Sequence, residues 1–286
     1  MRGGGRIRAP ATGPWTRVLL LVLLLSGCTE PAAESNGLSG RVEITGSSTI
    51  APLLSEIARR FEEEHAGVRV AVHTGGSSRG INDVMRGTAD IGMASRMLTG
   101  EENERLRVFR LGLDGIALIT NRENPVEALT TDLVVHIFTG AVDNWSAVGG
   151  HDRSITVVNK ADGRATLTVF LGHFGLERVD MAGDLIIGEN QHGIRAVAAD
   201  RGAIGYVSVG AAMVEMNRGT AIRILAIDGV VARLETVRAG DYPLLRELNL
   251  VTGAEPTEAT QAFLRFARSQ GVHDLFEAFG YVPGAD

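Results

Sequence analysis

The chain has 286 residues, of which 44% are hydrophobic and 22% are charged, and its formal net charge at pH 7 is −6. This negative charge excludes a typical nucleic-acid-binding protein, because such proteins need a surplus of lysine and arginine to bind the phosphate backbone. A single cysteine excludes an internal disulfide framework and any metal site made of several cysteines.

The first 27 residues are predicted to be a lipoprotein signal peptide. Arginines precede Val18–Leu25, an apolar run of eight residues. This run is too short for a membrane-spanning helix, which needs roughly 20 residues, but it is typical of a signal peptide. The sequence LSGC ends at Cys28 and resembles a bacterial lipobox, so Cys28 is predicted to carry the lipid; the alternative is a buried N-terminal strand. Cleavage would remove four arginines and no acidic residue, which changes the net charge from −6 to −10.

Residues 28–39 are small and polar, which predicts a flexible tether. Beyond it, strand patterns alternate with helix patterns in which apolar residues recur three and four positions apart. We predict strands at 41–45, 68–73 and 89–95, and helices at 50–65 and 81–87. This order is typical of a parallel sheet with helices on its faces.

The same strand–loop–helix order restarts near residue 117, which indicates a second α/β unit. A folded part of this length is sufficient for one large domain or two smaller ones. The predicted strands of the second unit lie at 115–121, 155–160 and 203–209, and its predicted helices at 130–140, 166–175 and 191–202. Late in the chain, one more strand is predicted at 245–253 and a terminal helical region at 258–280.

Three predicted loops share one composition, which combines glycine, hydroxyl side chains and a following helix. They are TGSST (45–49), TGGSSRG (74–80) and KADGRAT (160–166). The first N–H groups of a helix have no intrahelical partners and carry partial positive charge. Such loops lie at the carboxyl ends of strands, where open α/β sheets bind ligands. Each loop alone is better explained as an ordinary N-cap, but together the three predict a pocket for a small oxyanion.

Signatures of other chemistries are missing from the sequence. None of the three loops matches a nucleotide-binding glycine motif, no pair among the seven histidines has the spacing of metal ligands, and no nucleophile elbow occurs. The loop serines Ser47, Ser48, Ser77 and Ser78 have no base near them in the sequence. The chain is therefore predicted not to be an enzyme and to need no cofactor and no metal.

Four segments resemble the phosphate-binding subunits of bacterial phosphate ABC transporters. They begin at TGSSTIAPLLSEIARRFEEEHAGVRVAVHTGGSSRGINDVMRGTADIGMASR and continue with GLDGIALITN, IFTGAVDNWSAVGG and DRGAIGYVSVG. The resemblance implies an α/β fold of the two-lobed type II periplasmic-binding-protein class, with two crossover strands and a ligand cleft between the lobes. Lobe 1 would be residues 40–116 plus 250–286 and lobe 2 residues 117–249, with GIALITN and LRELNLVTG as the crossover strands.

The resemblance also implies which residues contact phosphate. Thr49 would supply a hydroxyl and Ile50 a backbone N–H, and Ser77 would supply a second hydroxyl. The complete predicted set is Ser48, Thr49, Ile50, Ser77, Ser78, Ser95, Arg96, Lys160, Gly163, Arg164, Ala165 and Thr166.

Three positions depart from the pattern of the family. Arg96 stands where some relatives have an aspartate that accepts the proton of monohydrogen phosphate, so Asp162 or a backbone carbonyl would have to replace that acceptor. Lys160, the only lysine of the chain, stands where many relatives have arginine. Arg164 stands where they have serine, and it offers a bidentate fork that Lys160 lacks.

The sequence thus predicts an exported, lipid-anchored solute-binding protein on the periplasmic or extracytoplasmic face of the membrane. Its expected partners are inorganic phosphate and an ABC permease in the cytoplasmic membrane, and it is expected to be a monomer that binds no nucleic acid. The alternatives are a binding protein for another oxyanion (sulfate, molybdate or arsenate), an exported phosphate-ester hydrolase that uses a loop serine, and a phosphate sensor or adhesin.

Overall fold

Strands from both predicted units join in one ten-stranded sheet in the computed structural model, which describes residues 37–284. The strand order is β2-β1-β3-β11-β4-β8-β6-β7, and β9 and β12 also pair with β4. The predicted signal peptide, Cys28 and most of the predicted tether lie outside the described residues. None of the helices in the described part of the chain is both long and apolar enough to cross a bilayer.

The first part of the sheet is parallel, as predicted. Strand β1 pairs with β2 on one side and with β3 on the other, so that Ile44 lies opposite both Val72 and Ile91. Helix α1 packs its apolar face, which includes Leu53 and Phe61, into the core. The bounds are β1 (Ser39–Gly46), α1 (Ala51–Glu64), β2 (Gly67–Thr74), α2 (Ser77–Met85), β3 (Ile91–Ala94) and α3 (Gly100–Arg105).

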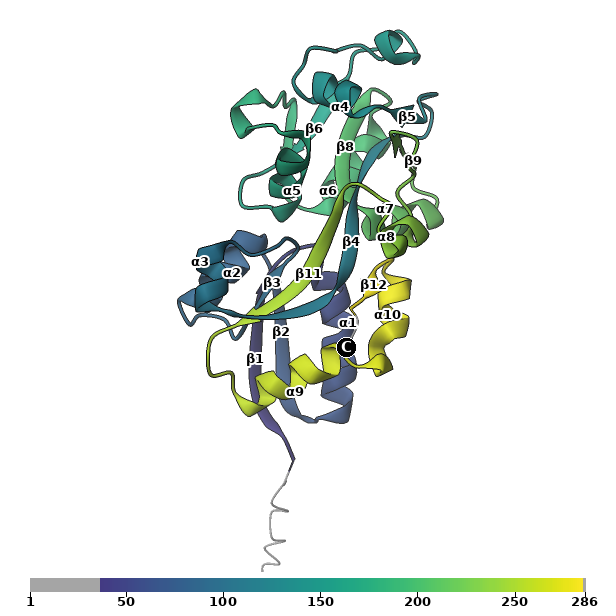
Figure 1. Ribbon diagram of the computed structural model, residues 1–286. Coiled ribbons are helices and arrows are strands. Elements are labelled where there is room, and N and C mark those ends of the chain that lie inside the picture. The colour runs from purple at the N-terminus through teal and green to yellow at the C-terminus, as the bar shows by residue number, and fades with distance from the viewer. Residues whose placement is uncertain (1–36, 285–286) are drawn as a thin grey trace, which may run out of the picture. The chain divides into compact units, whose positions relative to one another are not determined.

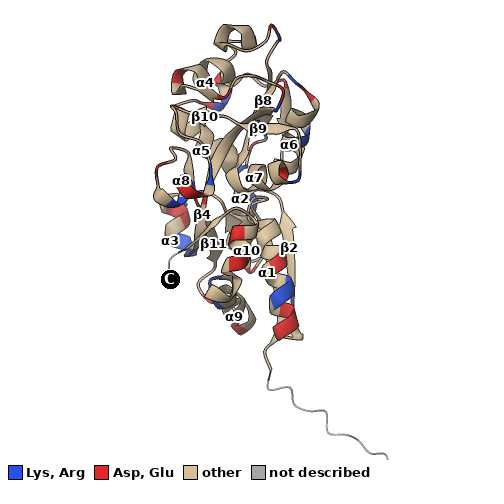
Figure 2. Cartoon of the chain, turned by 90° about the vertical axis from the view of Figure 1, so that its right-hand side faces the viewer, with Lys and Arg blue, Asp and Glu red and all other residues tan. Residues whose placement is uncertain are grey.

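Helix α2 begins four residues before the predicted helix at 81–87. Ser77 and Ser78, which we expected in a loop, therefore belong to its first turn. The acidic and basic side chains of the surface are interspersed, as Figure 2 shows along α1, where Arg59 pairs with Glu56 and Glu63.

Strands β4 (Arg107–Asn121) and β11 (Leu245–Thr252) are antiparallel and lie in the middle of the sheet. Strand β4 has 15 residues and not only the seven predicted at 115–121. Its first part pairs with β11, and its second part pairs with β8 (Ala203–Ser208). Figure 1 shows β4 and β11 passing together from the β1–β3 group toward the group around β8.

The second part of the sheet contains β6, β7 and β8, which are parallel to one another. Its helices are α4 (Thr131–Phe138), α5 (Ala165–Phe174), α6 (Asn190–Ala199), α7 (Val209–Asn217) and α8 (Leu234–Ala239). Its other strands are β5 (Ala128–Leu129), β6 (Thr156–Lys160), β7 (Leu185–Ile187), β9 (Ile222–Ile224) and β10 (Ala226–Ile227). The chain then returns to the first part through α9 (Glu258–Ala267), α10 (His273–Ala278) and β12 (Val282–Pro283).

The two large hydrophobic clusters divide along β4. Leu111 of β4 belongs to the cluster that contains Phe61 and Phe263, whereas Ile116 belongs to the cluster that contains Phe170. Burial of large apolar side chains of this kind contributes roughly 1.5–3 kcal/mol each. The β4–β11 pair thus connects the two hydrophobic clusters. The loops next to this pair form the candidate site.

Candidate functional site

Loops that follow three parallel strands meet around one small pocket. The loops between β1 and α1, between β2 and α2, and between β6 and α5 all contribute, together with the end of β3. Because these are the carboxyl ends of strands, the pocket lies where open α/β sheets bind ligands. It is lined by Ser47, Ser48, Thr49, Gly76, Ser77, Ser95, Arg164, Ala165, Thr166 and Gly188.

The structure brings together seven of the twelve site residues expected from the sequence. Those in the pocket are Ser48, Thr49, Ser77, Ser95, Arg164, Ala165 and Thr166. The five outside its lining are Ile50, Ser78, Arg96, Lys160 and Gly163. Three further residues line the pocket although the sequence analysis had not selected them: Ser47, Gly76 and Gly188.

Helices α1, α2 and α5 begin at this pocket without a side-chain cap. Their N-cap residues Ile50, Gly76 and Arg164 make no capping hydrogen bond through a side chain. Other helices of the chain are capped by hydroxyls, as Thr130 does for α4 and Thr257 for α9. The loop hydroxyls at the pocket are therefore not ordinary N-caps, and three helix starts with partial positive charge lie around one small volume.

Three buried serines form a hydrogen-bonded row along one side of the pocket. Ser47 Oγ donates to Ser95 Oγ at 2.9 Å. Ser77 Oγ accepts from the backbone N–H of Ser95 at 3.0 Å and lies 3.5 Å from Ser95 Oγ. Since Ser77 Oγ accepts a bond from Ser95, its own proton can be donated to a ligand.

Glycine allows two of the loops to touch. Gly76 has a φ of +95°, and a Cβ at this position would lie 2.7 Å from the carbonyl oxygen of Gly163. The backbone N–H of Ser78 donates to the same oxygen at 3.4 Å. Ser78 and Gly163 therefore lie at the contact between the second and third loops, beside the pocket and not in its lining.

Arg246 of β11 is a functional candidate that the sequence analysis missed. Its side chain is 1% exposed and pairs with Asp114 of β4, with Nη2 2.7 Å from Oδ2. The guanidinium also donates to Thr166 Oγ1 at 3.0 Å and to Thr49 Oγ1 at 3.1 Å. The sequence held one signal for it, because Arg246 stands among the leucines of the predicted crossover strand LRELNLVTG, and Asp114 directly precedes the other crossover strand, GIALITN.

Lys160 lies behind the pocket and is 1% exposed. Its Nζ donates to Asn190 Oδ1 at 3.3 Å, and Asn190 Nδ2 in turn donates to Thr49 Oγ1 at 3.2 Å. Burial and, to a smaller extent, the positive charge of Arg246 together lower the pKa of Lys160 to about 7. Lys160 therefore reaches the pocket through Asn190, which the sequence analysis did not select.

Arg164, at the edge of the pocket, pairs with Glu189, the residue before α6, with Nη1 2.7 Å from Oε1. The backbone of Thr49 is also fixed, since the Tyr281 hydroxyl donates to its carbonyl oxygen at 2.8 Å.

Arg96 does not join the residues that line the pocket. Both of its terminal nitrogens lie 2.8 Å from the carboxylate oxygens of Glu102 in α3, and Nη1 also donates to the carbonyl of Met97. Asp162, the proposed proton acceptor, pairs with Arg178, and its side chain is 82% exposed. Neither residue adds a group to the lining, whose ten residues include no carboxylate.

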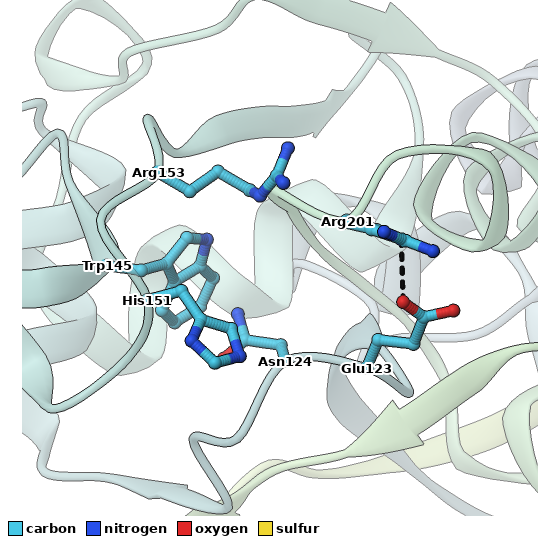
Figure 3. Close-up of a pocket in the computed structure, with 6 residues that line it drawn as sticks. All are labelled: Glu123, Asn124, Trp145, His151, Arg153 and Arg201. Carbon is cyan, nitrogen blue, oxygen red and sulfur yellow. Dashed lines mark ion pairs between the residues drawn. The ribbon is translucent and has the colours of Figure 1, made fainter.

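A second pocket is lined by residues that follow the end of β4 and precede the starts of β6 and β8, and it contains none of the predicted site residues. It is lined by Glu123, Asn124, Trp145, His151, Arg153 and Arg201 (Figure 3). Glu123 and Arg201 form an ion pair there at 2.6 Å, with both side chains more than half exposed. An exposed ion pair of this kind contributes little to the stability of the protein.

Comparisons with known proteins agree with this architecture. A family model described as a PBP superfamily domain matches residues 31–270. The phosphate-binding protein PstS of Bacillus subtilis is 30% identical over 255 residues, which are 87% of this chain and 82% of that protein.

Two solved structures are also similar. One is a phosphate ABC transporter substrate-binding protein with bound phosphate from Clostridium perfringens, with a TM-score of 0.80 and 31% identity over 86% of this chain and 100% of that chain. The other is an ABC-type phosphate transport receptor from Vibrio cholerae, with a TM-score of 0.70 and 27% identity over 85% of this chain and 100% of that chain. The predicted type II periplasmic-binding-protein fold is thereby confirmed. The chain belongs to the PBP superfamily and, within it, to the PstS family.

Proposed function

We propose that this protein captures inorganic phosphate and delivers it to an ABC permease in the cytoplasmic membrane. The observation that carries the proposal is the pocket itself, in which three uncapped helix starts surround a set of hydroxyl donors. Such a site stabilises a small oxyanion through N–H and O–H groups. The names of the similar proteins from Bacillus subtilis and Clostridium perfringens favour phosphate as that anion.

Capture would occur by closure of two lobes, residues 40–116 plus 250–286 and residues 117–249. The separate hydrophobic clusters on either side of the β4–β11 pair support this division. Each lobe supplies part of the pocket, Thr49 and Ser77 from the first and Thr166 from the second. A ligand that bonds to all of them favours the closed state, because only that state satisfies every contact.

The proposal includes export and attachment to the membrane. The predicted signal peptide at 1–27 and lipidation at Cys28 would place a monomer on the outer face of the cytoplasmic membrane. The protein would bind and release phosphate without any chemical step. Export can be checked by fractionating cells that express the chain, with Cys28→Ala as the variant that should be found free of the membrane.

Isothermal titration of residues 29–286 with phosphate tests the binding function. We expect saturable binding to one site per chain, and Thr166→Val should weaken it at least tenfold. The matched control is Thr252→Val, which removes another buried hydroxyl, on β11, outside the pocket. The proposal fails if millimolar phosphate gives no heat and protects the protein neither from thermal unfolding nor from proteolysis.

One observation favours a second candidate, a binding protein for another tetrahedral oxyanion. The ten residues that line the pocket include no carboxylate to accept the proton of monohydrogen phosphate. A pocket of donors alone suits a fully deprotonated anion such as sulfate or molybdate equally well. Competition titrations with sulfate, molybdate and arsenate separate the two candidates, and tighter binding of sulfate than of phosphate would favour the second.

A further inference from the structure

We infer that Arg246 and Asn190 are positioning residues that force the Thr49 hydroxyl to donate its proton into the pocket. The inference rests on the proposed function, since it concerns the same site, but it assigns a role to residues outside the pocket lining. It explains how hydroxyl groups, which can donate or accept hydrogen bonds, come to favour anions: the protein itself holds them as donors.

The hydrogen bonds around Thr49 Oγ1 carry the argument. A threonine hydroxyl has one proton to donate and two lone pairs that accept. Thr49 Oγ1 receives Nη2 of Arg246 at 3.1 Å and Nδ2 of Asn190 at 3.2 Å. A guanidinium and an amide nitrogen cannot accept hydrogen bonds. Both lone pairs are thus occupied, and the proton of Thr49 must go to a third group.

The pocket is where that third group lies. Thr49 is 3% exposed and lines the pocket, so an anion bound there would offer the oxygen that accepts this proton. A hydroxyl of this kind is a poor partner for a ligand group that can only donate, such as an ammonium. It is a good partner for an anion oxygen, because the bond is charge-assisted.

The orientation of the Asn190 amide is fixed by its own neighbours. Its Oδ1 accepts from Nζ of Lys160 at 3.3 Å and lies 3.4 Å from the backbone N–H of Ser208. Rotation of the amide by 180° would place its NH₂ group against these two donors, which is unfavourable. Lys160 therefore acts on the anion through Asn190 and Thr49, and the only lysine of the chain belongs to the same network.

Arg246 also orients the hydroxyl of Thr166, which lies after β6. Its Nη1 donates to Oγ1 of Thr166 at 3.0 Å, so one lone pair of that hydroxyl is also occupied. Its remaining bonds go to Asp114 Oδ2, from Nε at 3.0 Å and from Nη2 at 2.7 Å. One rigid guanidinium thus orients hydroxyls from two loops, one after β1 and one after β6.

The Arg246–Asp114 pair is electrically neutral as a unit, which makes the inference testable. If Arg246 served mainly as a charge that attracts the anion, its effect would be offset by Asp114 at 2.7 Å. If it orients hydroxyls, its effect must depend on those hydroxyls being present. A double-mutant cycle separates the two roles.

The cycle combines Thr49→Val with the paired replacement Arg246→Met/Asp114→Leu, and phosphate affinity is measured by titration. The paired replacement leaves the net charge unchanged and avoids an unpaired buried charge. We expect Thr49→Val to weaken binding at least tenfold in the natural background and less than threefold in the paired background. Equal losses in the two backgrounds would overturn the inference, because they would show that Arg246 does not act through Thr49.

Asn190→Ala provides a second, independent arm, which remains usable if the paired variant does not fold. Thr49→Val should again cost less in the Asn190→Ala background than in the natural one, and additive losses count against the inference. The natural protein is titrated first with phosphate, sulfate and arsenate. Binding of sulfate or arsenate but not phosphate refutes the proposed function alone, and the cycle is then measured with the anion that binds. Binding of none of them refutes both.

Discussion

Arg246 and Asp114 lie directly opposite each other in the register of β11 and β4, and their side chains form an ion pair that is almost completely buried. The two strands that connect both parts of the sheet are therefore joined by side chains as well as by backbone hydrogen bonds. The same guanidinium reaches two pocket hydroxyls, so the stability of the β4–β11 pair and the geometry of the site depend on one residue.

Breaking this ion pair should destabilise the protein far more than replacing it. We expect Asp114→Leu alone to reduce the free energy of unfolding by about 3–5 kcal/mol, because the Arg246 charge stays buried without its partner. The double variant Arg246→Met/Asp114→Leu should lie within about 1.5 kcal/mol of the natural protein, since volume-conserving apolar replacements cost little. Urea denaturation of the three proteins measures this, and a double variant that is as unstable as Asp114→Leu alone would contradict it.

Lys160 should make the stability of the ligand-free protein depend on pH. Burial lowers its pKa from 10.5 to about 7, so between these values the unfolded chain binds more protons at this residue than the folded chain. Stability from this residue therefore rises as the pH rises from about 7 to about 10.5. Lys160→Met should be stabilising at pH 6 and progressively less so above pH 7. Thermal unfolding in phosphate-free buffers checks this, and a pH-independent difference would contradict it.

Phosphate binding at pH 8 should take up protons through the same residue. An anion in the pocket attracts a positive charge on Nζ, so it raises the pKa of Lys160 from about 7. Titration heats measured in buffers of different ionisation enthalpy report the number of protons taken up. Lys160→Met is the control, because it retains any proton exchange by phosphate itself. Equal proton uptake by both proteins would exclude a role for Lys160, and we also expect this variant to bind at least tenfold more weakly.

Glu189→Gln should strengthen anion binding by about threefold or more. The carboxylate of Glu189 lies 2.7 Å from Nη1 of Arg164 at the edge of the pocket, where it repels an anion and occupies a donor. The matched control is Glu102→Gln, which frees Arg96 in a similar pair outside the pocket lining. Competition titration compares the two variants. A larger gain from Glu102→Gln would show that Arg96, as the sequence predicts, is an anion ligand.

Gly76→Ala should prevent the second and third loops from meeting. The added Cβ would lie 2.7 Å from the Gly163 carbonyl oxygen, and the φ of +95° disfavours any side chain. We expect at least a tenfold loss of phosphate affinity. Gly87→Ala is the control for backbone strain, because Gly87 has a φ of +70° with no atom within 4 Å of the added Cβ. Equal affinities of the two variants would show that the contact has no role in binding.

The elements with a clear local pattern could be predicted from the sequence, and so could the gathering of the three loops. The amphipathic face of α1 and the β-branched strand at 41–45 are local signals that tertiary packing did not override. The prediction made strand β4 too short, because its first four residues, 107–110, are partly or fully exposed and do not alternate between apolar and polar side chains. That exposed segment is a strand because it pairs with Asn249–Thr252 of β11, which is 139 to 145 positions away in the chain.

The network behind the pocket could not be predicted, because it depends on long-range register. Nothing in the local sequence places Arg246 beside Thr49 or Asn190 beside Lys160. The prediction that Arg96 contacts the anion had a related weakness, because it was based only on the place of this residue in the motif. Its side chain turns toward Glu102, a local partner six residues away. The place of a residue in a sequence motif thus predicted the path of the backbone well, but it predicted the direction of a long side chain poorly.

The bond from the Tyr281 hydroxyl to the Thr49 carbonyl has a consequence for how the protein is made. These residues are 232 positions apart, and Arg246 and Thr49 are 197 positions apart. Loops of this length close slowly and late, because ordering them costs entropy before any contact forms. During synthesis, the nascent chain therefore holds the first pocket loop before the residues that support it in the folded protein are in place. Ligand affinity should emerge only after residue 281 has left the ribosome, as the last property that the folding chain acquires.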